Sequence, residues 1–241
     1  MKKLNILLGG LALGAVVALM PTTVQAGIVG GTHDFSPTGS YGLAATNGIA
    51  RFKWGGETNY YNNPCQVCHI PHKSQFYSAS KAPLWNHKLS GNTYVTYDQA
   101  GSATFNALGL SVSLGSSVAC LSCHDGSVAI NQTANGTGST ATNSLNGAAV
   151  FAPSFAIEAI GGTDLTRMHP IGVSYTAAAA VDTELKPVAG ILAKMVKGTA
   201  KTVECASCHD IHQTIGASAT VSHDLIVDLE GGQLCLTCHS K

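Results

Sequence analysis

The sequence predicts a loop-rich chain with few regular elements, in which short helices are joined by irregular segments. Glycine accounts for 27 of the 241 residues, and Gly, Ser, Thr and Asn recur along the whole chain after residue 26. Aromatic residues make up only 6% of the chain and charged residues 11%. A chain of this length needs a sizeable core, and these side chains supply little of its bulk. Something other than aromatic side chains must therefore fill the core, and a repeated cysteine motif indicates what it is.

The first 26 residues have the parts of a secretory signal peptide. Two lysines are followed by an apolar run, and a small-residue cleavage site ends at Ala26. We expect residues 1–26 to be removed and residues 27–241 to form one domain. An uncleaved membrane anchor is the alternative, but the apolar run is short. No later stretch is apolar enough to span a membrane, so we expect an exported protein without an integral membrane segment. It would be extracellular or at the cell surface, or alternatively periplasmic.

The charge of the mature chain argues against one class of partner. Without the two lysines of the signal peptide, 11 basic and 13 acidic residues remain, a formal net charge of −2. The basic residues form no run, whereas a nucleic-acid-binding surface needs a basic patch or stripe. We therefore expect no nucleic-acid partner.

All eight cysteines belong to four copies of one motif, C-x-x-C-H. The copies are CQVCH (65–69), CLSCH (120–124), CASCH (205–209) and CLTCH (235–239). Disulfides suit an exported protein, but four short loops would stabilise little and need no histidine. Zinc sites seldom place a histidine directly after the second cysteine every time. C-x-x-C-H is the attachment signature of c-type haem, in which both thiols bond to the porphyrin and the histidine binds the iron.

The motifs therefore predict four haem c groups. The covalent attachment residues would be Cys65, Cys68, Cys120, Cys123, Cys205, Cys208, Cys235 and Cys238, and the proximal iron ligands His69, His124, His209 and His239. Four large apolar haems would supply the missing core, so we expect a loop-rich chain with short helices wrapped around a stack of four c-type haems.

Regular elements are expected in only a few places. Strand-like pieces occur at 94–97, 110–114, 171–175 and 225–229, and one helix is expected within 176–197, where Pro187 divides it. Residues 131–149 are polar and of low complexity, which predicts a surface loop. Asn131 and Asn135 lie in N-x-T sequons of that loop, and we expect them to be unmodified.

Six further histidines are available as ligands on the far faces of the irons. Methionine is the usual competitor, but the mature chain has only Met168 and Met195. Bis-histidine ligation is therefore the natural interpretation. The candidates are His33, His72, His169 and His212, with His87 and His223 also present.

The segment CASCHDIH (205–212) raises the question of which iron its second histidine serves. Two trans histidines on one iron have Cβ atoms about 12 Å apart, given Fe–N bonds of about 2 Å. Residues i and i+3 of a helical turn have Cβ atoms only about 5–6 Å apart. His209 and His212 therefore cannot ligate the same iron, and the same holds for His69 and His72 in CQVCHIPH. Such a spacing would bring neighbouring haems into contact.

The other histidines differ in their local context. Pro170 biases the preceding His169 to an extended backbone, which makes it a good ligand candidate. His33 lies 32 residues before the first motif cysteine, on an arm rich in Gly and Thr. We expect this arm to reach a neighbouring subunit; the alternative is that His33 folds back onto the first haem of its own chain.

The succession THDFS (32–36), CQVCHIPH (65–72), APLWNH (82–87), CLSCHDGSVA (120–129), HPIGVSY (169–175), CASCHDIH (205–212) and CLTCHSK (235–241) resembles known proteins. It is similar to the multihaem c-type cytochromes of metal-reducing bacteria, in particular the tetrahaem, OmcE-like cytochromes that polymerise into extracellular conductive filaments. The resemblance implies that His33, His72, His169 and His212 are the far-side ligands. It makes His87 and His223 weaker candidates, because His87 matches a position that is not reliably histidine and His223 has no clear counterpart. It also implies that one axial ligand can come from a neighbouring subunit.

Electron transfer is the function that these features predict. Bis-histidine haem has no open coordination site, so we expect a carrier and not an enzyme, acting as the subunit of a conductive filament in extracellular electron transfer. A homopolymer would exchange electrons with other multihaem cytochromes or extracellular metal oxides. A soluble periplasmic shuttle and a multihaem reductase with one open haem remain the alternatives, and the reductase would need acid–base residues beside a five-coordinate iron.

Overall fold

The structure, a computed structural model, describes residues 28, 33, 65, 68–70, 72, 82–128, 162–212 and 224–240. Within these residues the chain has few regular elements, and its longest helix has eight residues. The expectation of a loop-rich chain with short helices is therefore confirmed. The signal peptide, the polar loop at 131–149 with Asn131 and Asn135, and His223 lie outside the described residues.

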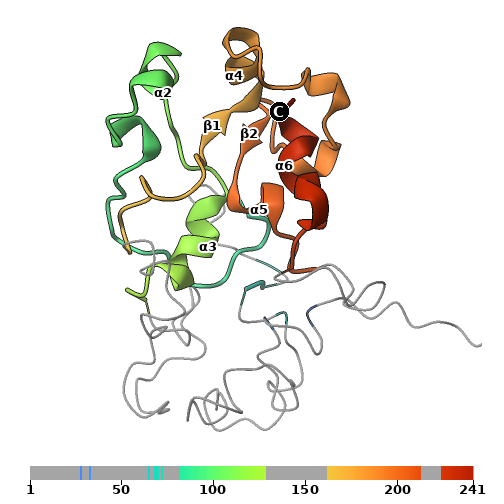
Figure 1. The fold of residues 1–241 in the computed structure, drawn as a ribbon. Helices are drawn as coiled ribbons and strands as arrows, with labels where there is room; N and C mark the ends of the chain where they lie inside the picture. The colour runs from blue at the N-terminus through green and yellow to red at the C-terminus, as the bar shows by residue number, and fades with distance from the viewer. Residues whose placement is uncertain are drawn as a thin grey trace, which may run out of the picture.

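The elements follow one another along the chain as short helices separated by irregular segments (Figure 1). The α-helices are α2 (Ala103–Ala107), α3 (Ser117–His124), α4 (Tyr175–Val181), α5 (Cys205–Cys208) and α6 (Gln233–Cys238). The 3₁₀ helices are η2 (Tyr97–Gln99), η4 (Val188–Gly190), η5 (Ala193–Met195) and η6 (Glu230–Gly232), and the strands are β1 (Val173–Ser174) and β2 (Thr202–Val203).

The strands form one short antiparallel ladder, with Val173 opposite Val203. The four strand-like pieces of the sequence are mostly single bridges. Val95 pairs with Asp164, Val112 with Val173, and Leu225 with His209. Only the piece at 171–175 contributes to a strand. The apolar residues of these pieces are arranged as expected, but each pairs at a single residue because the chain turns away on either side.

The helix expected within 176–197 was predicted too long. Helix α4 begins after Ser174, whose side chain accepts a hydrogen bond from the Ala177 amide at 3.3 Å, and it ends at Val181 because Asp182 is extended. In the rest of this stretch the chain forms only the 3₁₀ helices η4 and η5, both after Pro187. The residue before a proline avoids the helical region, which prevents the helix from resuming there.

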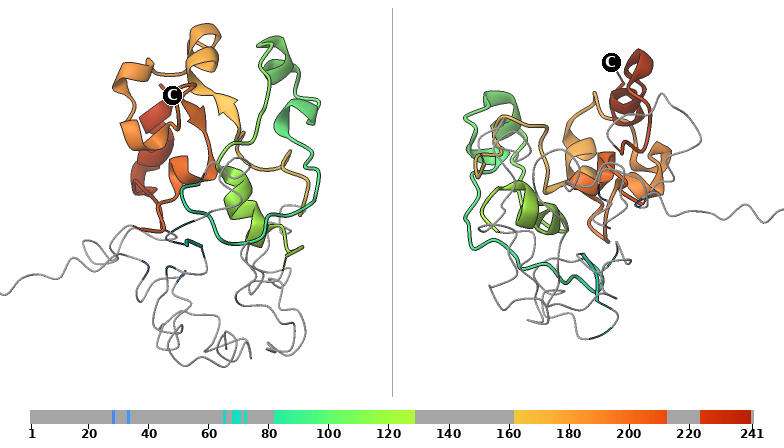
Figure 2. Two further views of the ribbon diagram at one scale, coloured as in Figure 1. Left: turned by 180° about the vertical axis from the view of Figure 1, so that it is seen from behind. Right: turned by 90° about the horizontal axis from the view of Figure 1, so that it is seen from below.

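Within the described residues, buried apolar side chains form three small clusters. The clusters are Tyr175, Ile191, Met195, Val196 and Ile226; Phe105, Val173 and Ala178; and Leu121, Leu165 and Ile171. This agrees with the shortage of aromatic residues in the sequence. Helices α3 and α5 lie side by side below the β1–β2 ladder, with α6 next to α5 (Figures 1 and 2). These three helices carry the second, third and fourth C-x-x-C-H motifs. No helix in the described segments has the length and apolar character needed to cross a membrane.

Candidate haem-binding site

Three histidine pairs place a motif histidine opposite a histidine from a distant part of the chain. The ring centroids of His69 and His212 are 6.1 Å apart. Those of His124 and His33 are 6.0 Å apart, and those of His239 and His169 are 6.2 Å apart. Each pair joins a predicted proximal ligand to a predicted far-side ligand.

These separations match the geometry of two imidazoles on one iron. Two Fe–N bonds of about 2.0 Å, each extended by about 1.1 Å from nitrogen to ring centre, give centroids about 6.2 Å apart. The three values differ by only 0.2 Å. The residues present therefore fit a haem iron between each pair.

Hydrogen bonds orient two of the paired histidines toward such a metal. The His69 Nδ1 lies 2.8 Å from the Pro83 carbonyl oxygen, and the His169 Nδ1 lies 3.0 Å from the Pro170 carbonyl oxygen. A carbonyl only accepts, so each Nδ1 donates, and in the neutral ring the lone pair is on Nε2. Burial lowers the pKa of His169, with a smaller contribution from His239, which favours the same neutral form. Such partners fix the tautomer and the ring orientation of metal-binding histidines.

In space, the cysteines of each motif lie near cysteines of the next motif along the chain. None of the eight forms a disulfide. The thiols of Cys120 and Cys205 are in hydrogen-bonding contact, which joins the second motif to the third. Burial raises the pKa of Cys123, and the proximity of Cys68 raises it further. Burial likewise raises the pKa of Cys208, with an added effect of Cys238. The attachment points therefore follow the order first, second, third, fourth motif, a continuous series of neighbours.

Burial of the thiols indicates apolar surroundings where the porphyrin edges would attach. Burial raises the pKa of Cys68 to about 12, so this thiol is neutral at ordinary pH. Cys65 and Cys235, the first cysteines of the first and last motifs, are exposed. The two end motifs are thus the more open ones.

A buried glutamate connects the second and third motifs. Glu204, next to Cys205, accepts hydrogen bonds from the amides of Gly115 and Ser117, each at 3.1 Å, and from the Ser117 hydroxyl. The Ser117 hydroxyl oxygen in turn accepts from the Cys205 amide at 2.9 Å. These bonds hold the start of α3 against the start of α5.

His87, a weaker candidate on sequence grounds, is fully buried at 0% exposure. Its Nδ1 lies 3.1 Å from the Ser122 hydroxyl, which itself donates to the Ala119 carbonyl at 2.6 Å. The hydroxyl therefore accepts from Nδ1, and the lone pair of the neutral ring is on Nε2. The ring nitrogens lie 3.5 and 3.6 Å from Cys123 Sγ, so His87 belongs to the surroundings of the second motif.

The remaining histidines are not brought into such pairs by the described residues. His72 is exposed. His209 pairs through its backbone with Leu225, and His33 also contacts Asp224, whose Oδ2 lies 3.4 Å from Nδ1. His33 thus lies beside His124 of the second motif in its own chain, whereas the alternative considered for this arm was the first haem.

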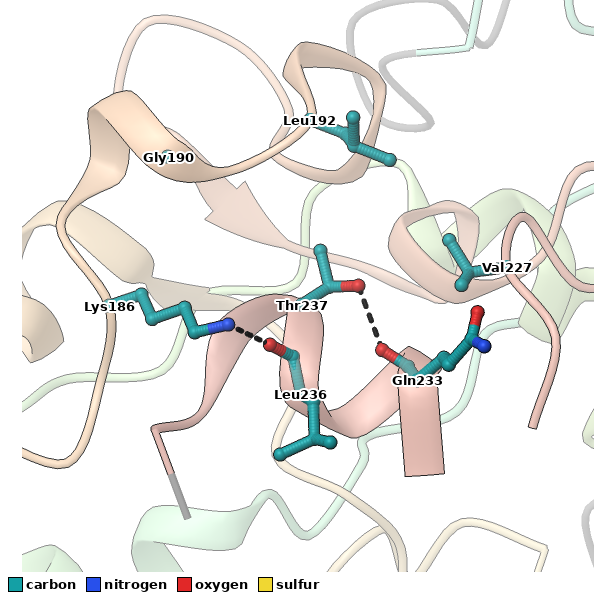
Figure 3. Close-up of a pocket in the computed structure, with 7 residues that line it drawn as sticks. All are labelled: Lys186, Gly190, Leu192, Val227, Gln233, Leu236 and Thr237. Atoms are coloured by element: carbon teal, nitrogen blue, oxygen red, sulfur yellow. Dashed lines mark hydrogen bonds between the residues drawn. The ribbon is translucent and has the colours of Figure 1, made fainter. Parts of the chain in front are cut away.

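The pocket beside α6 is distinct from the histidine pairs (Figure 3). Leu236 and Thr237, the two residues between the cysteines of the fourth motif, line it together with Lys186. The Lys186 amine donates to the Leu236 carbonyl, and the Thr237 hydroxyl donates to the Gln233 carbonyl at 3.0 Å. The Lys186 contact joins α6 to the segment between α4 and η4, and the lining residues do not include the motif cysteines or histidine.

Sequence reasoning did not identify the polar groups that hold the motifs in place. One is Glu204, which a glutamate directly before a C-x-x-C-H motif in a charge-poor chain could have suggested. Another is Asp125, after His124, which accepts from Tyr94 at 2.8 Å and from Asn92 at 3.0 Å. Burial opposes ionisation of Asp125, but its hydrogen bonds outweigh burial and lower its pKa.

Residues 198–241 match the family of the doubled CXXCH motif. The match covers the third and fourth motifs together with the loop between them. Comparison with curated proteins gives no match for the chain. The doubled motif indicates a multihaem c-type cytochrome, and CXXCH motifs imply covalently bound haem c and electron transfer.

Proposed function

We propose that the chain binds four haem c groups, each six-coordinate with two axial histidines, and passes electrons from one to the next. The observation that carries this proposal is the set of three histidine pairs with centroids 6.0–6.2 Å apart. They support His69–His212, His124–His33 and His169–His239 as the axial pairs. His209 and its haem form the fourth site, for which His72, His87 and His223 are the candidate second ligands.

A bis-histidine haem exchanges electrons at its edge and has no vacant position for a substrate. The chain's own residues bind the porphyrin through thioethers, orient the imidazoles and exclude water from the attachment sites. We therefore propose an electron carrier and not an enzyme. The close succession of attachment points supports transfer along a chain of haems.

Mass spectrometry and spectroscopy of the purified protein test this proposal together. The mass should equal that of residues 27–241 with four haems added, and the absorption spectrum should be entirely low-spin. A mass that fits fewer haems would refute the count. High-spin bands in the intact protein would refute full bis-histidine ligation and favour a multihaem reductase.

We further propose that the protein assembles into an extracellular filament through axial ligation between subunits. Because His33 already lies beside His124 of its own chain, we assign the crossing ligand to His72, which is exposed and follows the first motif by three residues. A head-to-tail contact of this kind need not close, and it generates an open helical polymer. Electrons would then pass between subunits and on to other multihaem cytochromes or extracellular metal oxides.

Electron microscopy and sedimentation test the filament. Wild-type protein should form filaments that are fully low-spin, and His72→Ala should remain dispersed with every haem attached. Filaments of the His72→Ala variant with an unchanged low-spin spectrum would refute the crossing role of His72. Wild-type protein that stays monomeric outside the cell envelope or in the periplasm would support a soluble shuttle instead.

A further inference from the structure

Glu204 is a negatively charged side chain in an almost fully buried position, with 1% of its surface exposed. Its carboxylate receives the three hydrogen bonds from Gly115 and Ser117 described above. Neither of the two ion pairs found in the described part of the chain involves it. Polar donors, and not a cation, therefore hold this charge.

The surroundings are shaped to accept the carboxylate. A Cβ atom added to Gly115 would lie 2.5 Å from Oε1 of Glu204, so any larger residue there would displace the carboxylate from its present position. The Glu204 amide donates to the Ser207 hydroxyl at 2.8 Å, which fixes the backbone at the start of α5. The carboxylate thus occupies a defined position that both helices create.

That position is the junction of two haem-attachment segments. Glu204 directly precedes Cys205, and Ser117 begins the helix that carries Cys120. The Cys120 and Cys205 thiols are themselves in contact. The charge therefore lies close to the edges of two porphyrins, while the exposed cysteines of the first and fourth motifs are at the outer ends of the series.

A buried negative charge favours the ferric form of a nearby haem, which carries one more positive charge than the ferrous form. In the protein interior this interaction is stronger than in water. We infer that Glu204 lowers the reduction potentials of the two haems attached at the second and third motifs relative to the same haems without this charge. This inference rests on the proposed haem loading. Its consequence is that Glu204 helps to set the free energy of electron transfer through the central pair.

Potentiometric titration of Glu204→Gln and Ser117→Ala, followed by visible and NMR spectra, tests this role. Haem content is measured first, because a wild type without four haems refutes the proposed function and not the role of Glu204. Removal of the charge in Glu204→Gln should shift the ferric–ferrous equilibrium of two haems by about tenfold toward the ferrous form. For a one-electron couple this is a rise of about 59 mV in potential.

Ser117→Ala is the matched control, because it removes a donor to the carboxylate and leaves the charge in place. The two potentials should then stay unchanged or fall, since one dipole that offsets the charge is gone. A rise of equal size in both variants would show that the contact acts only by fixing the two helices, and would overturn the inference. Unchanged potentials in Glu204→Gln would overturn it as well. If Glu204→Gln does not assemble, Glu204→Asp keeps the charge and should retain the low potentials. A rise of the two potentials in Glu204→Asp would also overturn the inference.

Discussion

The pairing of His212 with His69 leads to a prediction that separates this structure from other arrangements of the same histidines. The two ring centroids are 6.1 Å apart, although 142 positions of sequence separate the residues. Replacing His212 with alanine removes the imidazole that faces His69. His69 remains as the only axial ligand, so one haem becomes five-coordinate and high-spin.

The size of the effect follows from the number of sites. One iron in four loses its sixth ligand, so about one quarter of the low-spin signal should be replaced by high-spin signal. The ferrous His212→Ala protein should bind one more carbon monoxide molecule per chain than the wild type. Added imidazole should restore the low-spin spectrum, because it refills the vacant position.

The pairing itself is tested by identifying which haem becomes high-spin. Trp85 lies edge-on to His69, with centroids 6.0 Å apart and an interplanar angle of 89°. NMR contacts between the high-spin haem and Trp85 would identify it as the haem of the first motif. A fully low-spin variant would show that His212 is not a ligand. A high-spin haem at the third motif would show that the pairing is wrong. His72→Ala in dispersed subunits is the control and should add no carbon monoxide site.

Three further predictions concern stability and are checked by urea unfolding followed by far-UV circular dichroism, at equal haem content. Tyr175→Phe removes the hydroxyl that lies 2.8 Å from the Lys186 carbonyl and 3.0 Å from the Cys238 carbonyl, and should cost about 1–2 kcal/mol at pH 8. Burial raises the pKa of Tyr175 to about 12, above the usual 10.0, so its contribution is present below pH 10 and should disappear between pH 10 and about 12. Gly172→Ala should cost about 2–4 kcal/mol, because φ is +76° and the new Cβ would lie 2.9 Å from a backbone carbon of Ser113. Met195→Ala, at a side chain that is 2% exposed, should cost about 2–5 kcal/mol.

Matched variants isolate the cause of each loss. Gly101 has a φ of +71° with nothing within 4 Å of an added Cβ, so Gly101→Ala should cost only the strain of about 1–2 kcal/mol. An equal loss at Gly101 and Gly172 would contradict the steric argument. Lys194→Ala, in the same turn as Met195 but exposed, should change stability by less than about 0.5 kcal/mol. A stability difference between wild type and Tyr175→Phe that stays constant above pH 10 would contradict the role given to the hydroxyl.

The sequence predicts the attachment chemistry well because that chemistry is local. Two thiols and an imidazole must lie within five consecutive residues, so each motif can be recognised without knowledge of the fold. The small clusters of the core were also predictable from the shortage of aromatic side chains. The strand-like pieces were less informative, because Val95 and Val112 satisfy an alternating pattern yet pair at one residue only. Alternation reports which face is buried and not how far a partner strand continues.

The partner of each motif histidine was not predictable in the same way. His69 and His212 meet only because the chain between them folds back, and no local spacing encodes that contact. The geometric argument that His209 and His212 cannot share an iron did limit the possibilities, and the position of His212 opposite His69 is consistent with it. The burial of His87 was equally hidden, since its neighbours Ser122 and Cys123 are more than thirty residues away.

Proline has a particular part in orienting the paired histidines. The acceptors for His69 and His169 are the carbonyls of Pro83 and Pro170, two of only eight prolines in the chain. Proline has no N–H and a fixed φ, so it interrupts regular hydrogen bonding and leaves nearby carbonyls without a helical or strand partner. Such a carbonyl can accept a hydrogen bond from an imidazole Nδ1. In the proposed bis-histidine protein, the irregular backbone would therefore supply the acceptors that orient the ligand nitrogens toward the iron.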